Sequence, residues 1–83
     1  MLSEQIVREY ILKNFLFTED QSKLNSTDSL LGKGVIDSTG ALELVSFIEE
    51  QFGIKVEDDE LVPENLDSVN NVLAYLQRKK VAI

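Results

Sequence analysis

Ser38 is the side chain of this sequence best placed to do chemistry, because it stands between Asp37 and Thr39 where a helix is predicted to begin. With Asp37 as the N-cap, the Ser38 hydroxyl lies near backbone N–H groups and the positive end of the helix dipole, which suit an anion such as a phosphate. Gly40 leaves the first turn open to a bulky group, although glycine there costs about 1 kcal/mol of helix propensity relative to alanine. These residues leave two interpretations open: an ordinary helix start or a covalent attachment site.

Catalysis by Ser38 finds no support in the rest of the sequence. A nucleophilic serine needs a base to take its proton, and the 83 residues include no histidine. Ala41 stands where a Ser-x-x-Lys pattern would place a lysine base, and Ile36 occupies the first glycine position of a G-x-S-x-G elbow. We therefore predict no catalytic residue, and a small serine hydrolase is kept only as an alternative.

The amino-acid composition limits which metal sites and disulfides the chain can form. The absence of cysteine excludes disulfides and thiolate metal sites, and the absence of histidine removes the commonest zinc ligand. The acidic run from Glu57 to Glu60 lacks the ligand order and the central glycine of a calcium-binding loop. We expect no metal site in the chain.

The net charge of −7 is concentrated in one half of the chain, where residues 37–67 carry ten acidic side chains against one base, Lys55. This distribution argues against binding of nucleic acid or an anionic membrane and favours protein partners with basic patches, although acids can also serve solubility alone. The N-terminal residues do not resemble a signal peptide, and no apolar stretch approaches transmembrane length. We expect a cytoplasmic monomer.

The periodicity of apolar residues predicts an all-α fold, a small four-helix bundle with three main helices and one short helix. We expect a single domain over residues 1–83, since a chain of this length has room for one core. The first helix is expected from a cap at Ser3 to about Phe15. Pro63 permits a short helical turn that either ends before it or starts at it.

The second main helix is the most strongly predicted element, because an apolar stripe recurs at helical spacing after Asp37. Gly53 is well placed to end this helix, with Ile54 as the apolar contact that follows. Phe47 lies off the stripe, and we expect it to cover the long loop, with display to a partner as the alternative. The stripe consists of Ala41, Leu44, Val45, Ile48 and Phe52.

The segment between the first two helices is predicted to be a long ordered loop, with a helical turn near residues 28–31. Five apolar side chains are expected to hold it to the core: Leu24, Leu30, Leu31, Val35 and Ile36. The last helix is expected to begin with Asp67 or Ser68 as its cap. It should bury Val69, Val72, Leu73 and Leu76, and end near the bases Arg78, Lys79 and Lys80.

The stretch GVIDSTGALELVSFIEEQFGIKV, residues 34–56, resembles the core signature of acyl carrier and peptidyl carrier proteins. In that family an Asp-Ser dipeptide opens the second helix, and the serine carries 4′-phosphopantetheine through a phosphodiester. The resemblance extends over nearly the whole chain, from the first helix and the long loop ending in Gly-x-x-Asp-Ser to the short third and the final helix. It implies a carrier of acyl or aminoacyl groups and not an enzyme.

Carried over residue by residue, the resemblance makes Ser38 the attachment site of 4′-phosphopantetheine and Asp37 the acidic residue that the phosphopantetheinyl transferase reads. The thiol of the cofactor would hold the cargo as a thioester. The implied partners are the transferase, an adenylating enzyme that loads the cargo, and downstream acyl-using enzymes. The family docks its partners on the second helix, which makes candidates of Thr39, Leu42, Glu43, Ser46, Glu49 and Glu50. Of the acids, Glu43 and Glu50 are favoured over Glu49.

The sequence departs from the common family pattern at Thr39 and Gly40, where Leu or Met and then an acid or polar residue usually follow the serine. This departure counts against docking by fatty-acid synthase enzymes and favours a free-standing carrier that serves an adenylating enzyme. A carrier of the fatty-acid-synthesis type is the alternative within the family. Outside the family, the alternative is an unmodified acidic helical interaction module, in which Ser38→Ala is silent while charge reversal at Glu43 or Glu50 abolishes function.

Overall fold

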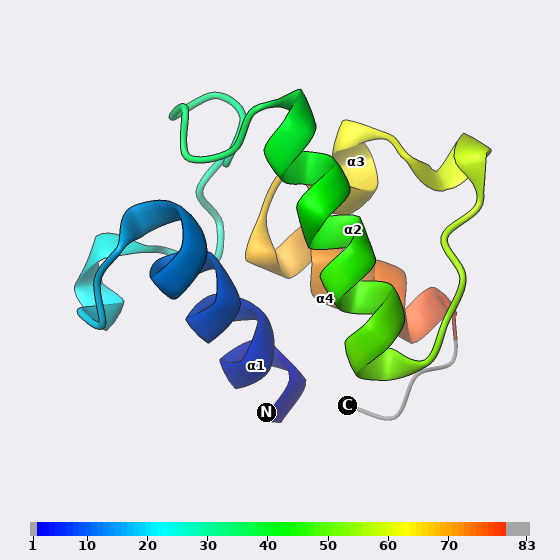
Figure 1. Ribbon diagram of the computed structural model, residues 1–83, viewed down its shortest axis with the longest axis horizontal. Coiled ribbons are helices and arrows are strands. Elements are labelled where there is room, and N and C mark those ends of the chain that lie inside the picture. The colour runs from blue at the N-terminus through cyan, green and yellow to red at the C-terminus, as the bar shows by residue number, and fades with distance from the viewer. Residues whose placement is uncertain (1, 80–83) are drawn as a thin grey trace.

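The computed structural model describes residues 2–79, and the regular structure in that range is entirely helical. α1 (Leu2–Ile11) continues into a π-helical turn, η1 (Leu12–Leu16), and the loop that follows contains a 3₁₀ turn, η2 (Gln21–Lys23). Then come α2 (Ser38–Phe52), the 3₁₀ turn η3 (Asp58–Glu60), α3 (Pro63–Leu66) and α4 (Val69–Arg78) (Figure 1). The predicted all-α bundle of three main helices and one short helix is confirmed.

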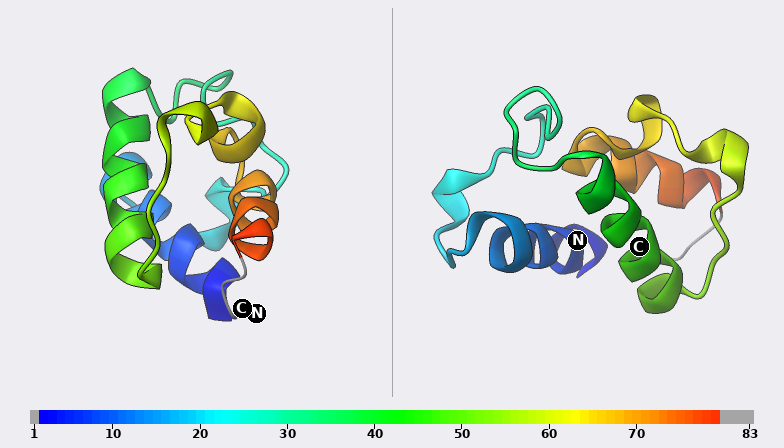
Figure 2. Two further views of the ribbon diagram at one scale, coloured as in Figure 1. Left: turned by 90° about the vertical axis from the view of Figure 1, so that its right-hand side faces the viewer. Right: turned by 45° about the horizontal axis from the view of Figure 1, so that its top comes forward.

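The core forms where the apolar stripes of the three main helices meet. α4 packs against α1 and α3. α2 lies in front of α4 in Figure 1, and the left view of Figure 2 shows α2 and α4 on opposite sides of the bundle. Each main helix contributes side chains that are completely shielded from solvent: Val7, Ile11, Leu44, Ile48, Val72 and Leu76. Burial of this kind contributes about 1.5–3 kcal/mol for each large apolar side chain, and it supplies the main stabilisation of so small a domain.

The end of α2 and the start of α4 both follow local sequence rules. Gly53 ends α2 in the left-handed conformation, with φ of 66°, and its N–H donates to the Glu49 carbonyl at 3.0 Å. Ser68 is the N-cap of α4 and accepts the Asn71 N–H at 3.0 Å, whereas Asp67 is the residue that ends α3. The C-terminal bases are described as far as Lys79, and Lys80 lies outside the described residues.

The long loop is ordered because apolar side chains and one guanidinium hold it. Leu24, Leu30 and Ile36 are buried as predicted. Arg8 of α1 donates to the carbonyl of Leu24 at 2.6 Å and also to Gln21 and Ser26, so that the loop is tied to the first helix. The predicted burial of Leu31 is wrong: its side chain is 41% exposed. The helical turn of the loop lies at η2, while residues 30–34 form a hydrogen-bonded turn, not the helical turn expected near residues 28–31.

Two further expectations are wrong in detail. Ser3 lies inside α1 and is buried, because the helix begins before it, so Ser3 is not the cap. Phe47 does not cover the loop; its ring stacks on Tyr10 of α1 with 3.9 Å between ring centroids and 15° between planes. The Tyr10 hydroxyl donates to the Glu43 carbonyl at 3.3 Å, so this aromatic pair joins α1 to α2.

Candidate functional site

The start of α2 is built by Asp37, as the sequence predicts. Asp37 has extended backbone geometry, and its Oδ1 accepts the N–H of Gly40 at 2.7 Å, which is the geometry of an N-cap. Ser38 is the first residue of the helix and is exposed. No hydrogen bond to another of the described residues occupies its hydroxyl. The hydroxyl is therefore accessible and lies at the positive end of a helix of 15 residues.

Ser38 stands at the rim of a half-open apolar hollow of about 240 Å³. The hollow separates α2 from the segment that leads into α3, and its walls include Ala41, Leu42, Val45, Leu61, Val62 and Leu66. Three of the four large apolar side chains that are well exposed within residues 3–79 line it: Leu31, Leu42 and Leu61. Exposed apolar side chains gathered at one place indicate a surface that receives a ligand or a partner.

Asp67 fixes the loop that borders this hollow. Its Oδ2 accepts the hydroxyl of Ser29 at 2.7 Å, and its Oδ1 accepts the N–H of Leu31 at 2.9 Å. The Asp67 carbonyl accepts the N–H of Leu30 at 2.6 Å. Asp67 thus ties the turn before α2 to the junction of α3 and α4, and it keeps Leu31 at the surface beside Ser38.

Close packing explains why position 40 is occupied by glycine. It is buried, and a Cβ at this position would lie 2.9 Å from Cε1 of Phe15, closer than carbon atoms normally approach. The turn η1 therefore presses against the first turn of α2. A shallow polar hollow lies at this contact, lined by Asn14 and Phe15 from η1 and by Asp37, Thr39 and Glu43 on the other side.

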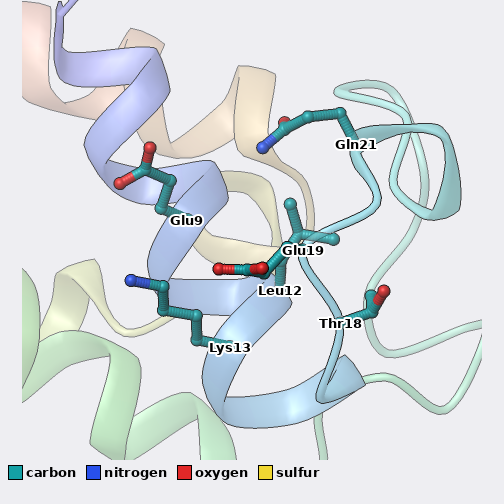
Figure 3. Close-up of a pocket in the computed structure, with 6 residues that line it drawn as sticks. All are labelled: Glu9, Leu12, Lys13, Thr18, Glu19 and Gln21. Atoms are coloured by element: carbon teal, nitrogen blue, oxygen red, sulfur yellow. The ribbon is translucent and has the colours of Figure 1, made fainter.

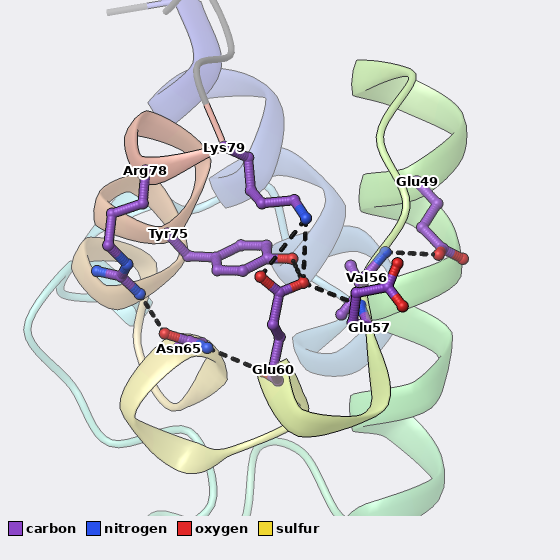
Figure 4. A network of polar contacts seen from close by, with 8 residues as sticks. All are labelled: Glu49, Val56, Glu57, Glu60, Asn65, Tyr75, Arg78 and Lys79. Carbon is purple, nitrogen blue, oxygen red and sulfur yellow. Dashed lines mark hydrogen bonds and ion pairs between the residues drawn. The ribbon is translucent and has the colours of Figure 1, made fainter.

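The predicted docking residues are not equivalent in the structure. Thr39, Leu42, Glu43, Ser46 and Glu50 are exposed on α2. Glu49 is partly buried, and its Oε2 accepts the N–H of Val56 at 2.9 Å, as Figure 4 shows. Glu49 therefore holds the chain that leaves α2, which fits the preference for Glu43 and Glu50 as docking acids.

A second hollow lies where α1 and η1 meet the loop (Figure 3). Its lining is mainly polar, with the charged side chains of Glu9, Lys13 and Glu19 around the buried Leu12. None of the site residues predicted from the sequence lines it. The hollow beside Ser38 is therefore the better candidate for a functional site.

Sequence reasoning missed the wall of the hollow opposite α2. Leu61, Val62 and Pro63 come from a segment for which the sequence analysis predicted only a short helical turn. The sequence feature that could have indicated this wall is a short apolar run directly after four acids, Glu57 to Glu60. An apolar run in an exposed acidic connection indicates a surface that is covered part of the time.

Comparisons with known proteins agree with this site. Residues 11–76 match the family described as "Phosphopantetheine attachment site". The D-alanyl carrier protein of Streptococcus uberis is 39% identical over 69 residues, which cover 81% of this chain and 86% of that protein. The solution structure of a holo acyl carrier protein from Nitrosomonas europaea superposes with a TM-score of 0.75 at 26% identity, over 96% of this chain and 98% of that one. A chain in a crystal structure described as an FAD-dependent dehydrogenase superposes with a TM-score of 0.73 at 26% identity, over 84% of this chain and 97% of that one.

The helical bundle, with an accessible serine at the start of its second main helix, is similar to the fold of a holo acyl carrier protein. The chain belongs to the phosphopantetheine-attachment family. It is therefore a carrier that binds 4′-phosphopantetheine covalently and is not itself catalytic. Among the described residues, no helix is both long enough and apolar enough to cross a membrane.

The residues around Ser38 fit this cofactor. A free hydroxyl can form the phosphodiester, the backbone N–H groups of the first turn of α2 favour the phosphate charge, and the adjoining hollow is apolar. Phosphopantetheine supplies a thiol, which explains how a chain without cysteine can hold a thioester.

Proposed function

We propose that Ser38 is the attachment residue and that the chain is an aminoacyl carrier, loaded by an adenylating enzyme. The observation that carries this proposal is the exposed Ser38 hydroxyl, held at the capped start of α2 beside the apolar hollow. In the modification, the Ser38 oxygen bonds to the phosphorus of the phosphopantetheine part of coenzyme A and the phosphoanhydride bond breaks. Adenosine 3′,5′-bisphosphate leaves with the bridging oxygen, and the serine proton is lost to the transferase or solvent. Asp37 takes part by fixing the first turn and by offering its second carboxylate oxygen to the transferase.

The aminoacyl cargo is supported by two features. Several relatives of this chain, at 37–40% identity, are D-alanyl carrier proteins, and the positions that follow Ser38 are Thr39 and Gly40 rather than the bulky apolar residue common in fatty-acid carriers. A small polar cargo such as an amino acid needs no apolar chamber. We expect the carrier to work in the cytoplasm, where the ATP used for adenylation is available.

The apolar hollow favours a second candidate, a carrier of apolar acyl chains. A chain of a few methylene groups would gain about 0.8 kcal/mol for each CH₂ buried against Leu42 and Leu61. In that case the natural loading enzyme would deliver a fatty acid and not an amino acid.

Loading of the holo protein distinguishes the two candidates. The chain is first converted with coenzyme A and a broad-specificity phosphopantetheinyl transferase, and conversion is checked by intact mass. It is then incubated with ATP and either D-alanine and a D-alanine-activating enzyme or octanoate and a fatty-acid-activating enzyme. We expect faster thioester formation with D-alanine, and none on Ser38→Ala. Preferential loading with octanoate would replace the aminoacyl proposal by the fatty-acid one.

Docking should depend on charge, because Glu43 and Glu50 are exposed on the helix that begins at Ser38. Such contacts are screened over about 8–10 Å at physiological salt, so the apparent KM of a loading enzyme for this carrier should rise with ionic strength. The adenylating enzyme, the transferase and the acyl-using enzymes are expected to present basic patches to this face.

A further inference from the structure

The segment 57–62 ends in two residues that line the hollow beside Ser38, Leu61 and Val62, and none of its residues is buried. The chain enters this segment at Val56 and leaves it toward Asn65, both of which are buried. Between these two points no side chain reaches the core, so apolar packing cannot fix the position of the wall. Polar contacts must hold it.

One carboxylate oxygen collects most of these contacts. Oε1 of Glu60 accepts the Tyr75 hydroxyl and the Glu57 N–H, each at 2.9 Å, and it lies 3.1 Å from Nζ of Lys79 (Figure 4). The carbonyl of the same residue accepts the side-chain amide of Asn65 at 2.9 Å. Glu60 is thus joined to α4 and α3 at once.

The anchor on α4 is rigid. Tyr75 is 1% exposed and lies among the core side chains of α4, so its hydroxyl is held in place by the bundle. Lys79 follows one turn later, and its ammonium pairs with Glu60. Asn65 also accepts a hydrogen bond from Arg78, which joins α3 to the same end of α4.

Charge repulsion within the segment opposes the position in which the wall lies against the hollow. Glu57, Asp58 and Asp59 precede Glu60 without interruption, and like charges at this spacing repel one another. The ammonium of Lys79 offsets that repulsion at Glu60 alone. A wall that is held by one polar cluster against internal repulsion can be released by a single change.

We propose that Glu60 is a positioning residue that holds Leu61 and Val62 against the hollow beside Ser38. Leu61 and Val62 directly follow Glu60 and line the hollow, whereas the carboxylate of Glu60 points to α4. Loss of the Glu60 contacts lets the wall move away from α2 while the core of the bundle stays intact. The effect of this wall on the pantetheine arm rests on Ser38 being the attachment residue.

Amide hydrogen exchange of the apo protein tests the wall without reference to the cofactor. The N–H groups of Glu60, Leu61 and Val62 donate to carbonyls within the segment, so their exchange reports on its opening. In Glu60→Ala, exchange at these three amides should accelerate about tenfold or more, since contacts to a charged carboxylate are lost. Core amides of α4 should accelerate only by the factor that corresponds to the loss of unfolding free energy measured by urea for the same variant.

Two further variants separate positioning from general stability. Asp59→Ala removes a negative charge from the same turn, and among the described residues the Asp59 side chain makes no hydrogen bond or ion pair, so exchange should stay within twofold of wild type. Glu60→Gln keeps an oxygen acceptor for Tyr75 and Glu57 but loses the ion pair, and it should restore most of the protection. Unchanged exchange of the wall amides in Glu60→Ala, or equal effects of Glu60→Ala and Asp59→Ala, would overturn the proposal.

The same variants are then converted to the holo form and followed by methyl chemical shifts. In wild type, attachment of the arm should shift the methyl signals of Leu61, Val62 and Leu42. In Glu60→Ala the shifts at Leu61 and Val62 should fall below half of the wild-type values, while that of Leu42 is kept. Unchanged shifts at Leu61 and Val62 would show that Glu60 does not place the wall beside the arm. If no arm attaches at all, the attachment proposal fails, and the positioning role is decided by the exchange data alone.

Discussion

A hydrogen bond of 2.7 Å joins the carboxylate of Asp37 to the backbone N–H of Gly40 and so spans Ser38. This bond caps α2 and fixes the backbone on both sides of the hydroxyl. It also uses only one oxygen of the carboxylate, so that the other can face a partner. Asp37 therefore has a structural role in the cap, and we propose that it also has the recognition role that its family position implies.

These two roles of Asp37 can be separated by substitution. Asp37→Asn keeps an oxygen acceptor for the Gly40 N–H and should lower the free energy of unfolding by less than about 0.5 kcal/mol, whereas Asp37→Ala should lower it by about 1 kcal/mol. Both variants should be modified by the transferase at least tenfold more slowly, because both lack the charge. Urea unfolding and initial rates of modification measure the two effects. Full-speed modification of Asp37→Asn would show that the charge is not read.

The contact between Phe15 and Gly40 predicts a coupled pair. Gly40→Ala gains about 1 kcal/mol of helix propensity but forces its Cβ into the Phe15 ring, which typically costs about 1–3 kcal/mol, so we expect a net loss of about 1 kcal/mol. In a Phe15→Leu background the same substitution should be neutral or stabilising. A double-mutant cycle by urea unfolding measures the coupling. Additive effects would contradict close packing between η1 and α2.

Glu49 and Glu50 are neighbours in sequence with different predicted roles. Glu49→Ala removes the acceptor of the Val56 N–H and should cost about 1 kcal/mol of stability, while Glu50→Ala should change stability by less than about 0.5 kcal/mol. Thermal and urea unfolding of the two variants provide the measurement. A reversed order of the two stabilities would show that Glu49 does not hold the chain after α2.

Glu60 should make the stability depend on pH on the acid side. The pKa of its carboxyl lies below the usual value of 4.5, chiefly because it accepts the Glu57 N–H and the Tyr75 hydroxyl and also faces Lys79. A carboxyl whose pKa is lower in the folded state stabilises the fold above its unfolded pKa, and this contribution is lost as the pH falls through the folded pKa. The stability difference between wild type and Glu60→Gln should therefore be constant from about pH 7 to about pH 5 and shrink below that range.

Urea unfolding at a series of pH values measures this difference. Asp59→Asn is the matched control, because it removes a charge from the same turn without removing a hydrogen bond. A difference for Glu60→Gln that persists unchanged to about pH 3 would mean that the carboxylate charge is not responsible.

The elements that were predicted correctly are those set by local sequence. The cap at Asp37 and the end of α2 at Gly53 each depend on backbone preferences within a few residues. A short helical turn at Pro63 was also expected, and of the two placements left open the structure shows the one that starts at Pro63. The position of Ser38 in the first turn follows from the same rules. For this reason the most important part of the candidate site was visible in the sequence.

The features that were missed depend on contacts between distant segments. Leu31 fits an apolar core pattern, but Asp67, 36 residues later, holds its backbone at the surface. The ring of Phe47 could pack on either the loop or α1, and only the position of Tyr10 decides between them. Leu61 becomes part of the site because Glu60 reaches Tyr75 across the fold. Sequence spacing contains no information on such pairings.

The account depends most directly on Ser38 as the attachment residue. The measurement is intact mass, followed by mass mapping of peptides, after incubation with coenzyme A and a broad-specificity phosphopantetheinyl transferase. Wild type and the control Ser46→Ala, which changes an exposed serine of the same helix, should each gain one phosphopantetheine, located on the peptide that contains Ser38. Ser38→Ala should gain none. No gain on wild type, or an equal gain on Ser38→Ala, would contradict the account.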